Sequence, residues 1–484
     1  MTAEMTALII AVAVLAIDIV IRIIALVVIA AGRRPQTALA WLLAIAFLPW
    51  IGLPLYLIAG QARLPKARRD RQAQVDMLIR RAVDDLDLER PVLPEWLDPI
   101  ATLNENLGSI PMVGGNRATL HHHHAEVLEA MIRDIDKATA TIHVEFYIMA
   151  LDDTVAPFYD ALARAVDRGV VVRVLLDHLG SHGYPGYKAG IRRLDEMGAL
   201  WQLMLPFRPL RGQIQRPDLR NHRKLLVVDG VVAHTGSRNL IDPGYQKPKN
   251  LKKGLQWKDF MVRFEGPVVS AIDAVFLTDW FCETGEILAD EQAEPPEVEA
   301  GDLSCQVVPS GPGYDVENNL SLFASLIYSA REKVILTSPY FVPDDSIRYA
   351  VTTAAQSGRV VELFVSEVGD QFMVFHAQRS YYEELLRAGV RIWLYEGPTI
   401  LHSKHVTIDD DVAVIGSSNL DMRSFTLDLE ISVLVHSASF TADVREVEQY
   451  YRDHSTELTL DAWSQQGRLA HTLDHVLRLT ATVQ

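Results

Sequence analysis

The chain contains 484 residues, of which 49% are hydrophobic and 22% are charged, and 46 Lys and Arg against 62 Asp and Glu give a formal net charge of −16. This composition excludes a disordered or collagen-like protein, and the length suffices for about three domains. So acidic a body repels polyphosphate, which disfavours nucleic acid as a partner. The two cysteines, Cys282 and Cys305, predict neither a disulfide framework nor a structural zinc site.

Residues 1–70 predict a transmembrane hairpin. Two apolar stretches, about 7–31 and 37–60, are each long enough to cross a hydrocarbon core of about 30 Å. A signal peptide would begin with basic residues and have a shorter apolar core, whereas no basic side chain precedes the first stretch. Pro49 and Pro54 leave a kinked or re-entrant second segment as an alternative.

Charged residues within and after these stretches predict an ion pair and an orientation. Asp18 and Arg22 lie four positions apart and share a helix face, where they can pair. Only Arg33 and Arg34 lie between the two stretches, and a larger basic cluster follows the second. The cluster consists of Arg63, Lys66, Arg68, Arg69 and Arg71. Because Lys and Arg concentrate on the cytoplasmic side, we expect a multi-pass protein of the cell (inner, cytoplasmic) membrane whose larger part faces the cytoplasm, with the cluster near anionic lipid headgroups.

The remainder of the chain predicts strands that alternate with helices, in an order that occurs twice. The expected strands are 141–149, 170–176 and 225–228 in the first copy and 334–336, 360–365, 391–395 and 406–408 in the second. We therefore expect two duplicated α/β domains, 110–283 and 303–484, packed face to face. Residues 71–109 are a juxtamembrane linker, and residues 284–302, rich in Glu and Pro, are an acidic linker between the domains.

A motif that occurs once in each copy carries the chemistry. The two segments are HRKLLVVDGVVAHTGSRN, from His222, and HSKHVTIDDDVAVIGSSN, from His402. Six residue types recur at the same offsets in both. They are His222, Lys224, Asp229, Gly236, Ser237 and Asn239 in the first copy and His402, Lys404, Asp409, Gly416, Ser417 and Asn419 in the second. Six matched positions in two copies do not arise by chance.

The spacing within the motif suggests a site for an anion. His and Lys two positions apart on an extended segment project from one face, and Ser and Asn add hydrogen-bond donors. Two such halves facing each other make a cage with two imidazoles and two ammonium groups. The cage suits phosphodiester exchange, in which one neutral imidazole attacks phosphorus and the other, protonated, supplies a proton to the leaving alcohol. Because side chains supply the cations, we expect no metal and no other cofactor.

Other polar residues admit two interpretations. Asp229 and Asp409 lie where a strand turns, and they either act at the site or hold backbone N–H groups. The basic stretch 207–224 either attracts anionic headgroups or is a solvated loop with ion pairs, and the same holds for the lysine cluster 247–253. The tract His121–His124 is metal-binding or an exposed, incidental run, and the second is favoured because four consecutive histidines do not converge on one ion.

The doubled motif resembles that of the phospholipase D superfamily, whose two HxKxxxxD motifs carry a phosphohistidine mechanism. More narrowly, nearly the whole chain resembles the bacterial cardiolipin synthases of that superfamily. The matching blocks include IHVEFYIM at 142–149, LLDHLGS at 175–181, YPGYK at 184–188, RPDLRNHRK at 216–224, NLIDPGY at 239–245 and SSNLDMRSFTLDLE at 417–430, besides the apolar N-terminus.

The resemblance implies a membrane-bound phosphatidyltransferase that makes cardiolipin and glycerol from two phosphatidylglycerol molecules. It implies that His222 is the nucleophile and His402 the general acid and base, although the sequence leaves that choice open. It also implies that a downstream carboxylate orients each imidazole, Asp259 in the first half and Glu430 in the second. Phospholipids and the bilayer are then the partners, a phospholipase D-type hydrolase and another phosphatidyl donor are the alternatives, and the oligomeric state is not indicated.

Overall fold

The computed structural model describes residues 3–30, 35–60, 64, 66–74, 90–208, 216–288, 301–314 and 316–480. They form two compact units, Met1–Arg63 and Leu64–Gln484. Sequence predictions that concern Arg33, Arg34, Arg63, Arg211 and most of the acidic linker fall outside the described residues.

The first unit contains a helix long enough to span a membrane. Helix α1, Ala3–Ala30, has 28 residues and carries the Asp18–Arg22 pair, whose side chains lie 2.8 Å apart. At about 1.5 Å per residue, a helix of this length exceeds a hydrocarbon core of about 30 Å. It is the one helix among the described residues that is long and apolar enough to cross.

The second apolar stretch is not one helix, which corrects the prediction for 37–60. It divides at Leu48 into α2, Pro35–Phe47, and α3, Pro49–Ala59. Pro49 begins α3, and Leu48 before it, with φ of −136° and ψ of 64°, lies outside the helical region and does not continue α2. A Cβ on Gly52 would lie 2.8 Å from the backbone of Ala44, so α3 folds back closely on α2. With 13 and 11 residues, each helix is too short to cross alone, and the fold matches the re-entrant alternative.

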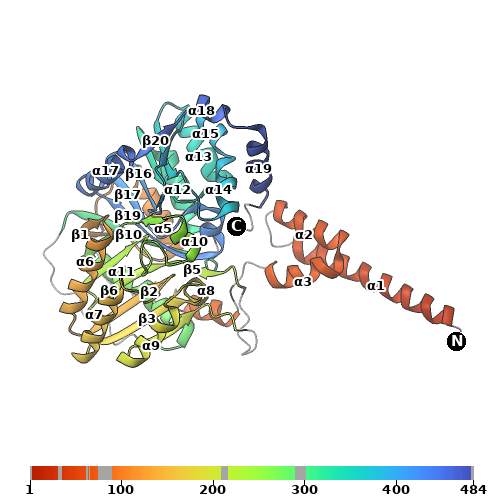
Figure 1. Ribbon diagram of the computed structural model, residues 1–484, viewed down its shortest axis with the longest axis horizontal. Coiled ribbons are helices and arrows are strands. Elements are labelled where there is room, and N and C mark those ends of the chain that lie inside the picture. Colours follow the sequence, from red (N-terminus) through yellow and green to blue (C-terminus); the bar gives the residue numbers. More distant parts are fainter. Residues whose placement is uncertain are drawn as a thin grey trace. The chain divides into compact units, whose positions relative to one another are not determined.

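The second unit contains one α/β fold used twice, as the duplicated pattern predicts (Figure 1). The strands of the first half are β1 Val113–His121, β2 Thr141–Phe146, β3 Val171–Asp177, β4 Leu200–Met204, β6 Lys224–Val228, β7 Val232–Gly236 and β9 Met261–Glu265. Those of the second half are β10 Leu303–Ser310, β11 Lys333–Thr337, β13 Val360–Ser366, β14 Arg391–Tyr395, β16 His405–Ile408, β17 Val412–Gly416, β19 Asp428–His436 and β20 Ser455–Leu458. The seven predicted strands are all present within three residues at either end.

The two halves share one strand order. From β1 outward the first half runs β1-β9-β7-β6-β2-β3-β4, and from β10 outward the second runs β10-β19-β17-β16-β11-β13-β14, with β20 at its outer edge. The antiparallel pair β1 and β10 joins the two into one sheet, with Val113 opposite Cys305. The two halves form a single compact unit, so the structure does not divide them into separate domains. The domain limits at the acidic linker therefore remain a prediction.

Helices cover both halves of this sheet. Helix α5, Asp98–Gly108, precedes the first half in the sequence but packs on the core of the second half. In the first half the helices are α6 His124–Lys137, α7 Ala156–Asp167, α8 His178–His182, α9 Tyr187–Met197, α10 Pro248–Lys252 and α11 Val268–Thr284. In the second they are α12 Asn318–Ser329, α13 Asp345–Gln356, α14 Phe372–Arg379, α15 Tyr382–Ala388, α16 Met422–Thr426, α17 Ala438–Asp453, α18 Leu460–Ser464 and α19 Arg468–Arg478. Each half has its own apolar core, in which buried strand residues such as Val144 and Leu363 pack beneath the helices.

Two basic residues of the predicted lipid-facing cluster instead bind the protein itself. Residues 66–74 are helical, and Arg68 in this helix is buried and pairs with Asp279 and Glu283 of α11. Arg71 donates to the carbonyl oxygen of Cys282 at 2.8 Å. These contacts attach the start of the second unit to α11.

Candidate active site

The structure brings the two motif histidines to one cavity. His222 and His402 both line a cleft of about 560 Å³ in the second unit. Its walls are aromatic and polar, and they include Tyr147, Tyr184, Tyr245, Trp257, Tyr340, Asn239, Lys247, Lys249, Asp370, Asn419, Arg423 and Asp428. A cleft with convergent polar groups and two buried imidazoles is the expected form of a binding site for a small polar group such as a phosphate ester.

A short strand from one half places His222 against the other half. Strand β5, Arg220–Asn221, pairs in parallel with the start of β19, so that Asn221 lies opposite Leu429. The next residue, His222, donates its backbone N–H to the carbonyl oxygen of Leu429 at 2.8 Å. Glu430 follows Leu429, and its Oε1 lies 2.9 Å from Nδ1 of His222.

A short strand that pairs across the halves also places His402. Strand β15, Thr399–Leu401, pairs in parallel with β8, Gln256–Lys258. His402 donates its backbone N–H to the carbonyl oxygen of Lys258 at 2.8 Å, and the adjacent Asp259 lies with Oδ1 2.7 Å from Nδ1 of His402. Because a carboxylate engages Nδ1 of each ring, Nε2 is the nitrogen that remains for chemistry on both.

The predicted assignment of Asp259 to His222 and of Glu430 to His402 is therefore wrong. Each carboxylate orients the histidine of the opposite half, 208 residues away for His222 and 143 for His402. The physical reason is that each histidine follows a strand that pairs across the halves, so the acid next to it in space is not the one downstream in its own half.

The motif serines hold these carboxylates rather than facing an open anion site. Ser237 Oγ donates to Oδ1 of Asp259 at 2.7 Å, and Ser417 Oγ donates to Glu430. Ser237 also accepts from the N–H of Phe260, which fixes the strand that carries the acid. The motif predicts that these serines either bind the phosphate or orient other groups of the site, and their contacts support the orienting role.

The motif asparagines line the cavity from both halves. Asn239 Nδ2 donates to the hydroxyl of Tyr245 at 2.8 Å, and its Oδ1 accepts from the N–H of Ile148. Asn419 Oδ1 is buried and has no hydrogen-bond partner among the described residues. The two asparagines therefore differ, since one is committed to the wall and the other retains an unused acceptor.

The motif lysines are buried beside the histidines. Lys404 Nζ donates to the carbonyl oxygen of His402 at 2.5 Å, and Lys224 makes the same bond to His222. Burial lowers the pKa of Lys224 to about 8 and that of Lys404 to about 7, against the opposing pull of nearby carboxylates. Both ammonium groups are therefore charged at slightly acid pH and lose that charge close to neutrality.

The two imidazoles have unequal electrostatic surroundings. Burial, together with the charges of Lys224 and Lys404, holds the pKa of His222 well below its usual value. Burial also lowers the pKa of His402, but the Asp259 carboxylate opposes that shift. Burial alone would raise the pKa of Asp259, yet the charge and hydrogen bond of His402 hold it low.

The carboxyl group beside His222 titrates near neutrality. Burial raises the pKa of Glu430 to about 7. Asp259 is ionised beside His402, whereas Glu430 titrates beside His222, so His402 is the more easily protonated of the two rings although burial lowers the pKa of both.

Asp229 and Asp409 hold the fold at a distance from the chemistry. Each has a left-handed backbone, with φ of 52° and 47°, at the end of the motif strand remote from the histidine. Asp229 accepts from the N–H groups of residues 139–141 at 2.8 Å, and Asp409 accepts from those of residues 331–333 at 2.8–3.2 Å. Of the two interpretations from the sequence, the contacts support the structural one.

The two basic stretches have different contacts in the structure. In the stretch 207–224, Arg220 is buried against Asp177 at 3.0 Å, Arg223 is buried against Asp279, and Arg216 pairs with Asp218. In the lysine cluster, by contrast, Lys247 and Lys249 line the cavity, and Lys247 Nζ lies 3.8 Å from the ring centroid of Tyr184. The second cluster is therefore the one that presents charge at the cleft.

Several wall residues are absent from the sequence-derived set of site residues. The ring of Tyr147 lies edge-on to His222 at 4.9 Å between centroids, and Arg423 pairs with Asp428 at 3.1 Å within the cavity wall. Burial raises the pKa of Asp428 to about 7. Each of these residues belongs to a sequence block singled out above, IHVEFYIM or SSNLDMRSFTLDLE, and membership of those blocks is the signal that could have found them.

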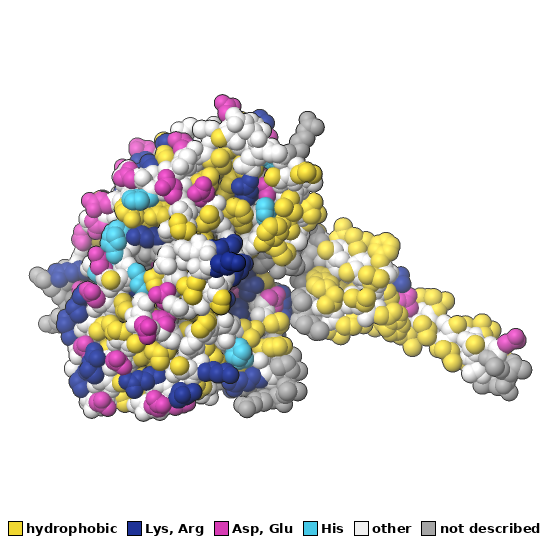
Figure 2. Space-filling model, in the orientation of Figure 1, with side chains coloured by type: hydrophobic (Ala, Val, Ile, Leu, Met, Phe, Trp, Pro, Cys, Tyr) yellow, Lys and Arg dark blue, Asp and Glu magenta, His cyan; other side chains and the backbone are white. Residues whose placement is uncertain are grey.

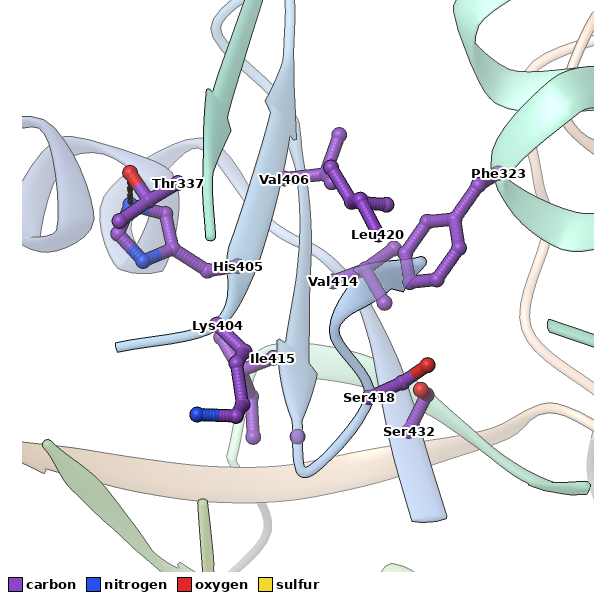
Figure 3. Close-up of a pocket in the computed structure, with 11 residues that line it drawn as sticks. Phe323, Thr337, Lys404, His405, Val406, Val414, Ile415, Ser418, Leu420 and Ser432 are labelled. Carbon is purple, nitrogen blue, oxygen red and sulfur yellow. Dashed lines mark hydrogen bonds between the residues drawn. The ribbon is translucent and has the colours of Figure 1, made fainter. Parts of the chain in front are cut away.

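Histidines outside the two motifs pack into the structure. His405, the first residue of β16, is buried with Nε2 3.1 Å from Oγ1 of Thr337 (Figure 3). The run His121–His124 is half-buried except for His123, which corrects the expectation of a wholly exposed run. No group of three His, Cys, Asp or Glu arranged to hold a metal ion occurs among the residues that the structure describes.

Comparison with known proteins gives a consistent result along the chain. The family described as "Cardiolipin synthase, PLD-like domain" matches residues 131–280 and 323–452, and "Phospholipase_D-nuclease N-terminal" matches residues 10–61. Cardiolipin synthase A of Proteus mirabilis (strain HI4320) is 34% identical over 453 residues, 92% of each chain. Cardiolipin synthase A of Yersinia pseudotuberculosis serotype O:1b (strain IP 31758) is 36% identical over 447 residues, 89% of this chain and 90% of that one.

A solved structure shares the fold at low sequence identity. The phosphatidylserine synthase of Haemophilus influenzae Rd KW20 superposes with a TM-score of 0.59 at 14% identity, over 79% of this chain and 99% of its own. At this identity the likeness concerns the fold alone.

Proposed function

The chain belongs to the cardiolipin synthase family of phospholipase D-like proteins, and we propose that it is a membrane-bound phosphatidyltransferase that makes cardiolipin. It transfers a phosphatidyl group from one phosphatidylglycerol to a glycerol hydroxyl of a second, and glycerol is released. The observation that carries this proposal is that His222 and His402, one from each motif copy, line a single cavity.

The first step forms a phosphatidyl-histidine. Nε2 of neutral His222 attacks phosphorus, the bond from phosphorus to the glycerol oxygen breaks, and protonated His402 gives its Nε2 proton to that oxygen. Lys224 and Lys404 provide positive charge beside the phosphate oxygens, where negative charge accumulates in the transition state. Glycerol leaves, and His402 is then neutral.

In the second step the proton moves in the opposite direction, and His402 acts as the base. His402 takes the proton from a glycerol hydroxyl of the second phosphatidylglycerol, the resulting oxygen attacks phosphorus, and the bond from phosphorus to His222 breaks. Cardiolipin leaves, and the enzyme returns to its starting protonation state. Water in place of the lipid hydroxyl gives phosphatidic acid, so a cavity that favours the lipid acceptor separates synthesis from hydrolysis.

The electrostatic asymmetry of the two rings supports this order of roles. A nucleophile must be neutral, and the pKa of His222 is held well below its usual value by burial and two ammonium groups. A general acid must be protonated, and ionised Asp259 opposes the lowering of the pKa of His402 by burial, which makes His402 the more easily protonated of the two rings.

The membrane placement belongs to the same proposal. Helix α1 anchors the chain, α2 and α3 enter the bilayer with it, and the second unit lies on the cytoplasmic side. The basic residues after the second apolar stretch and the length of α1 support this arrangement.

The proposal is tested with purified full-length protein in vesicles that contain phosphatidylglycerol. Cardiolipin and glycerol should appear in equal amounts without added nucleotide. His222→Ala and His402→Ala should each lower the rate by at least about 10⁴-fold, since each removes a group that makes or breaks bonds. Thermal unfolding of each variant provides the control that the protein still folds.

Two other products would contradict the proposal in different ways. Phosphatidic acid as the main product would show a hydrolase with the same site residues. Cardiolipin that forms only when another phosphatidyl donor is added would retain the transferase chemistry and overturn the assignment of phosphatidylglycerol as donor.

A further inference from the structure

Helix α19 presents its apolar side outward. Leu469, Leu473, Val476 and Leu479 recur at helical spacing and are 87%, 37%, 54% and 82% exposed. Amphipathic helices of the same unit do the opposite, as in α6, where Val127, Met131 and Ile135 are buried. Such an outward apolar stripe is unfavourable in water and calls for a covering surface.

A buried polar contact fixes α19 in this orientation. Asp474, on the inner side of the helix, is 1% exposed, with Oδ1 2.6 Å from Nδ1 of His376 and Oδ2 3.3 Å from Nε of Arg379. Both partners belong to α14. The inner side of α19 is therefore bound by polar contacts, and the outward position of its leucines is built into the fold rather than a result of loose packing.

The exposed stripe continues to the rim of the catalytic cavity. At the start of α14, Phe372 and Met373 are 62% and 43% exposed, while Asp370, Gln371 and Val374 on either side of them line the cavity. Figure 2 shows hydrophobic side chains gathered over the region that α19 and α14 occupy in Figure 1. The apolar surface and the entrance to the site are thus contiguous.

Basic side chains lie at the same rim. Lys249 Nζ lies 3.4 Å from the carbonyl oxygen of Asp370, and Lys247 also lines the cavity. On α19 itself, the guanidinium of Arg478 lies 4.2 Å from the ring centroid of Tyr381. Leucines that reach acyl chains beside cations that reach headgroups are the features of a helix that lies in an anionic membrane interface.

We propose that α19, with Phe372 and Met373, docks into the interface of an anionic bilayer and opens the catalytic cavity directly to phospholipids in that bilayer. The proposal rests on the proposed function for the identity of the substrate. The bilayer is favoured over a second copy of the chain because the stripe adjoins the entrance to the cavity proposed for phospholipids and because the same chain carries α1, a helix long and apolar enough to cross a membrane.

A fluorescent label tests the docking without reference to catalysis. The full-length protein carrying Leu473→Cys, labelled with an environment-sensitive dye, is placed in phosphatidylglycerol-containing vesicles, and Leu200→Cys, 48% exposed on β4, is the matched control. Native Cys282 and Cys305 are both buried. We expect the label at Leu473 to shift to shorter wavelength and to be quenched by bromine on the lipid acyl chains, with no such change at Leu200.

Two fluorescence results would overturn the proposal. Equal quenching of both labels by aqueous iodide would show that the stripe faces water. Protection from iodide without quenching by brominated lipid would assign the stripe to a protein surface, either a second copy or another part of the chain.

A kinetic comparison links docking to substrate access. In Leu473→Glu/Val476→Glu, kcat/KM for phosphatidylglycerol in vesicles should fall at least about tenfold, because charged side chains do not enter the acyl region. For short-chain phosphatidylglycerol dispersed as monomers it should not change, and Leu200→Glu should alter neither. An equal loss on both substrates would overturn the proposal, whereas failure of the unaltered protein to make cardiolipin would contradict the proposed function and leave the fluorescence result standing.

Discussion

At the scale of single residues, the geometry of the site depends on which carboxylate contacts which imidazole. Asp259 and Glu430 each cross to the histidine of the other half, and each is held by a serine of its own half, Ser237 or Ser417. The hydrogen bonds therefore run from serine to carboxylate to imidazole, and each half orients the imidazole of the other half. Hydrogen bonds to the carboxylates that contact an imidazole fix the tautomer and rotation of that ring.

The crossed pairing predicts the effect of Asp259→Asn on the pH profile. The Asp259 carboxylate raises the pKa of His402, so its removal lowers that pKa. His402 must be protonated to act as the acid, and activity is lost as the pH rises through its pKa. The falling limb of kcat against pH should therefore move to lower pH, with kcat near neutrality reduced at least about a hundredfold.

Glu430→Gln is the matched control, because Glu430 contacts the other ring. It should slow phosphohistidine formation and leave the falling limb in place. If Glu430→Gln moved that limb and Asp259→Asn did not, each carboxylate would serve its own half and the crossed arrangement would be wrong.

The buried lysines predict a second pH effect, on substrate binding. Burial lowers the pKa of Lys404 to about 7 and of Lys224 to about 8, and each ammonium loses its charge as the pH rises through its pKa. KM for the anionic lipid should rise about tenfold across this interval, since loss of a charge-assisted contact costs about 1.5 kcal/mol or more. The phosphodiester does not titrate in this range, so a constant KM would show that these charges are not felt at the phosphate.

At the scale of secondary-structure elements, the position of each motif strand depends on the aspartate at its end. Asp229 is left-handed, with φ of 52°, and its carboxylate accepts from the N–H groups of residues 139–141. It joins the end of β6 to the start of β2, the strand beside it. Asp229, the aspartate of the motif, therefore fixes the position of two strands rather than the position of the substrate.

Asp229→Ala should therefore reduce stability rather than catalysis. Loss of these hydrogen bonds and of a residue suited to the left-handed region should lower the free energy of unfolding by about 3 kcal/mol. Asp229→Asn keeps one acceptor oxygen, and asparagine tolerates the left-handed backbone, so this substitution should lower the free energy of unfolding by less. Thermal unfolding measures both, with kcat of the folded variants within about twofold of the unaltered protein. A folded Asp229→Ala protein of unchanged stability and no activity would return Asp229 to the catalytic set.

Strand and motif positions can be predicted from the sequence because they depend on local periodicity. The pairing of strands across the halves does not depend on local periodicity and cannot be predicted in this way. His222 and His402 stand out by matched spacing, and the strands β13 and β14 have the bounds that their apolar runs indicate to within one residue. Glu430 reaches His222 only because β5 pairs with β19, which no local pattern encodes. The outward leucines of α19 likewise depend on tertiary packing, whereas the break at Leu48 follows from Pro49 and is a local signal.

At the scale of the whole molecule, duplication produces a site that neither half could form alone. Strands β5 and β15 each leave their own half to pair with the other, and they carry His222 and His402 to the same cavity. One chain therefore supplies both imidazoles and both carboxylates of the cavity. An oligomer is not required for a complete site.

This completeness predicts the outcome of mixing two inactive variants. His222→Ala and His402→Ala, co-reconstituted in the same vesicles, should give no more activity than the sum of the two measured separately, because each chain lacks one of its two imidazoles. If the halves instead exchanged between chains, random pairing in a dimer would restore about a quarter of the unaltered activity. Unaltered protein mixed equally with His222→Ala calibrates the assay, and it should retain half the rate when each chain works on its own.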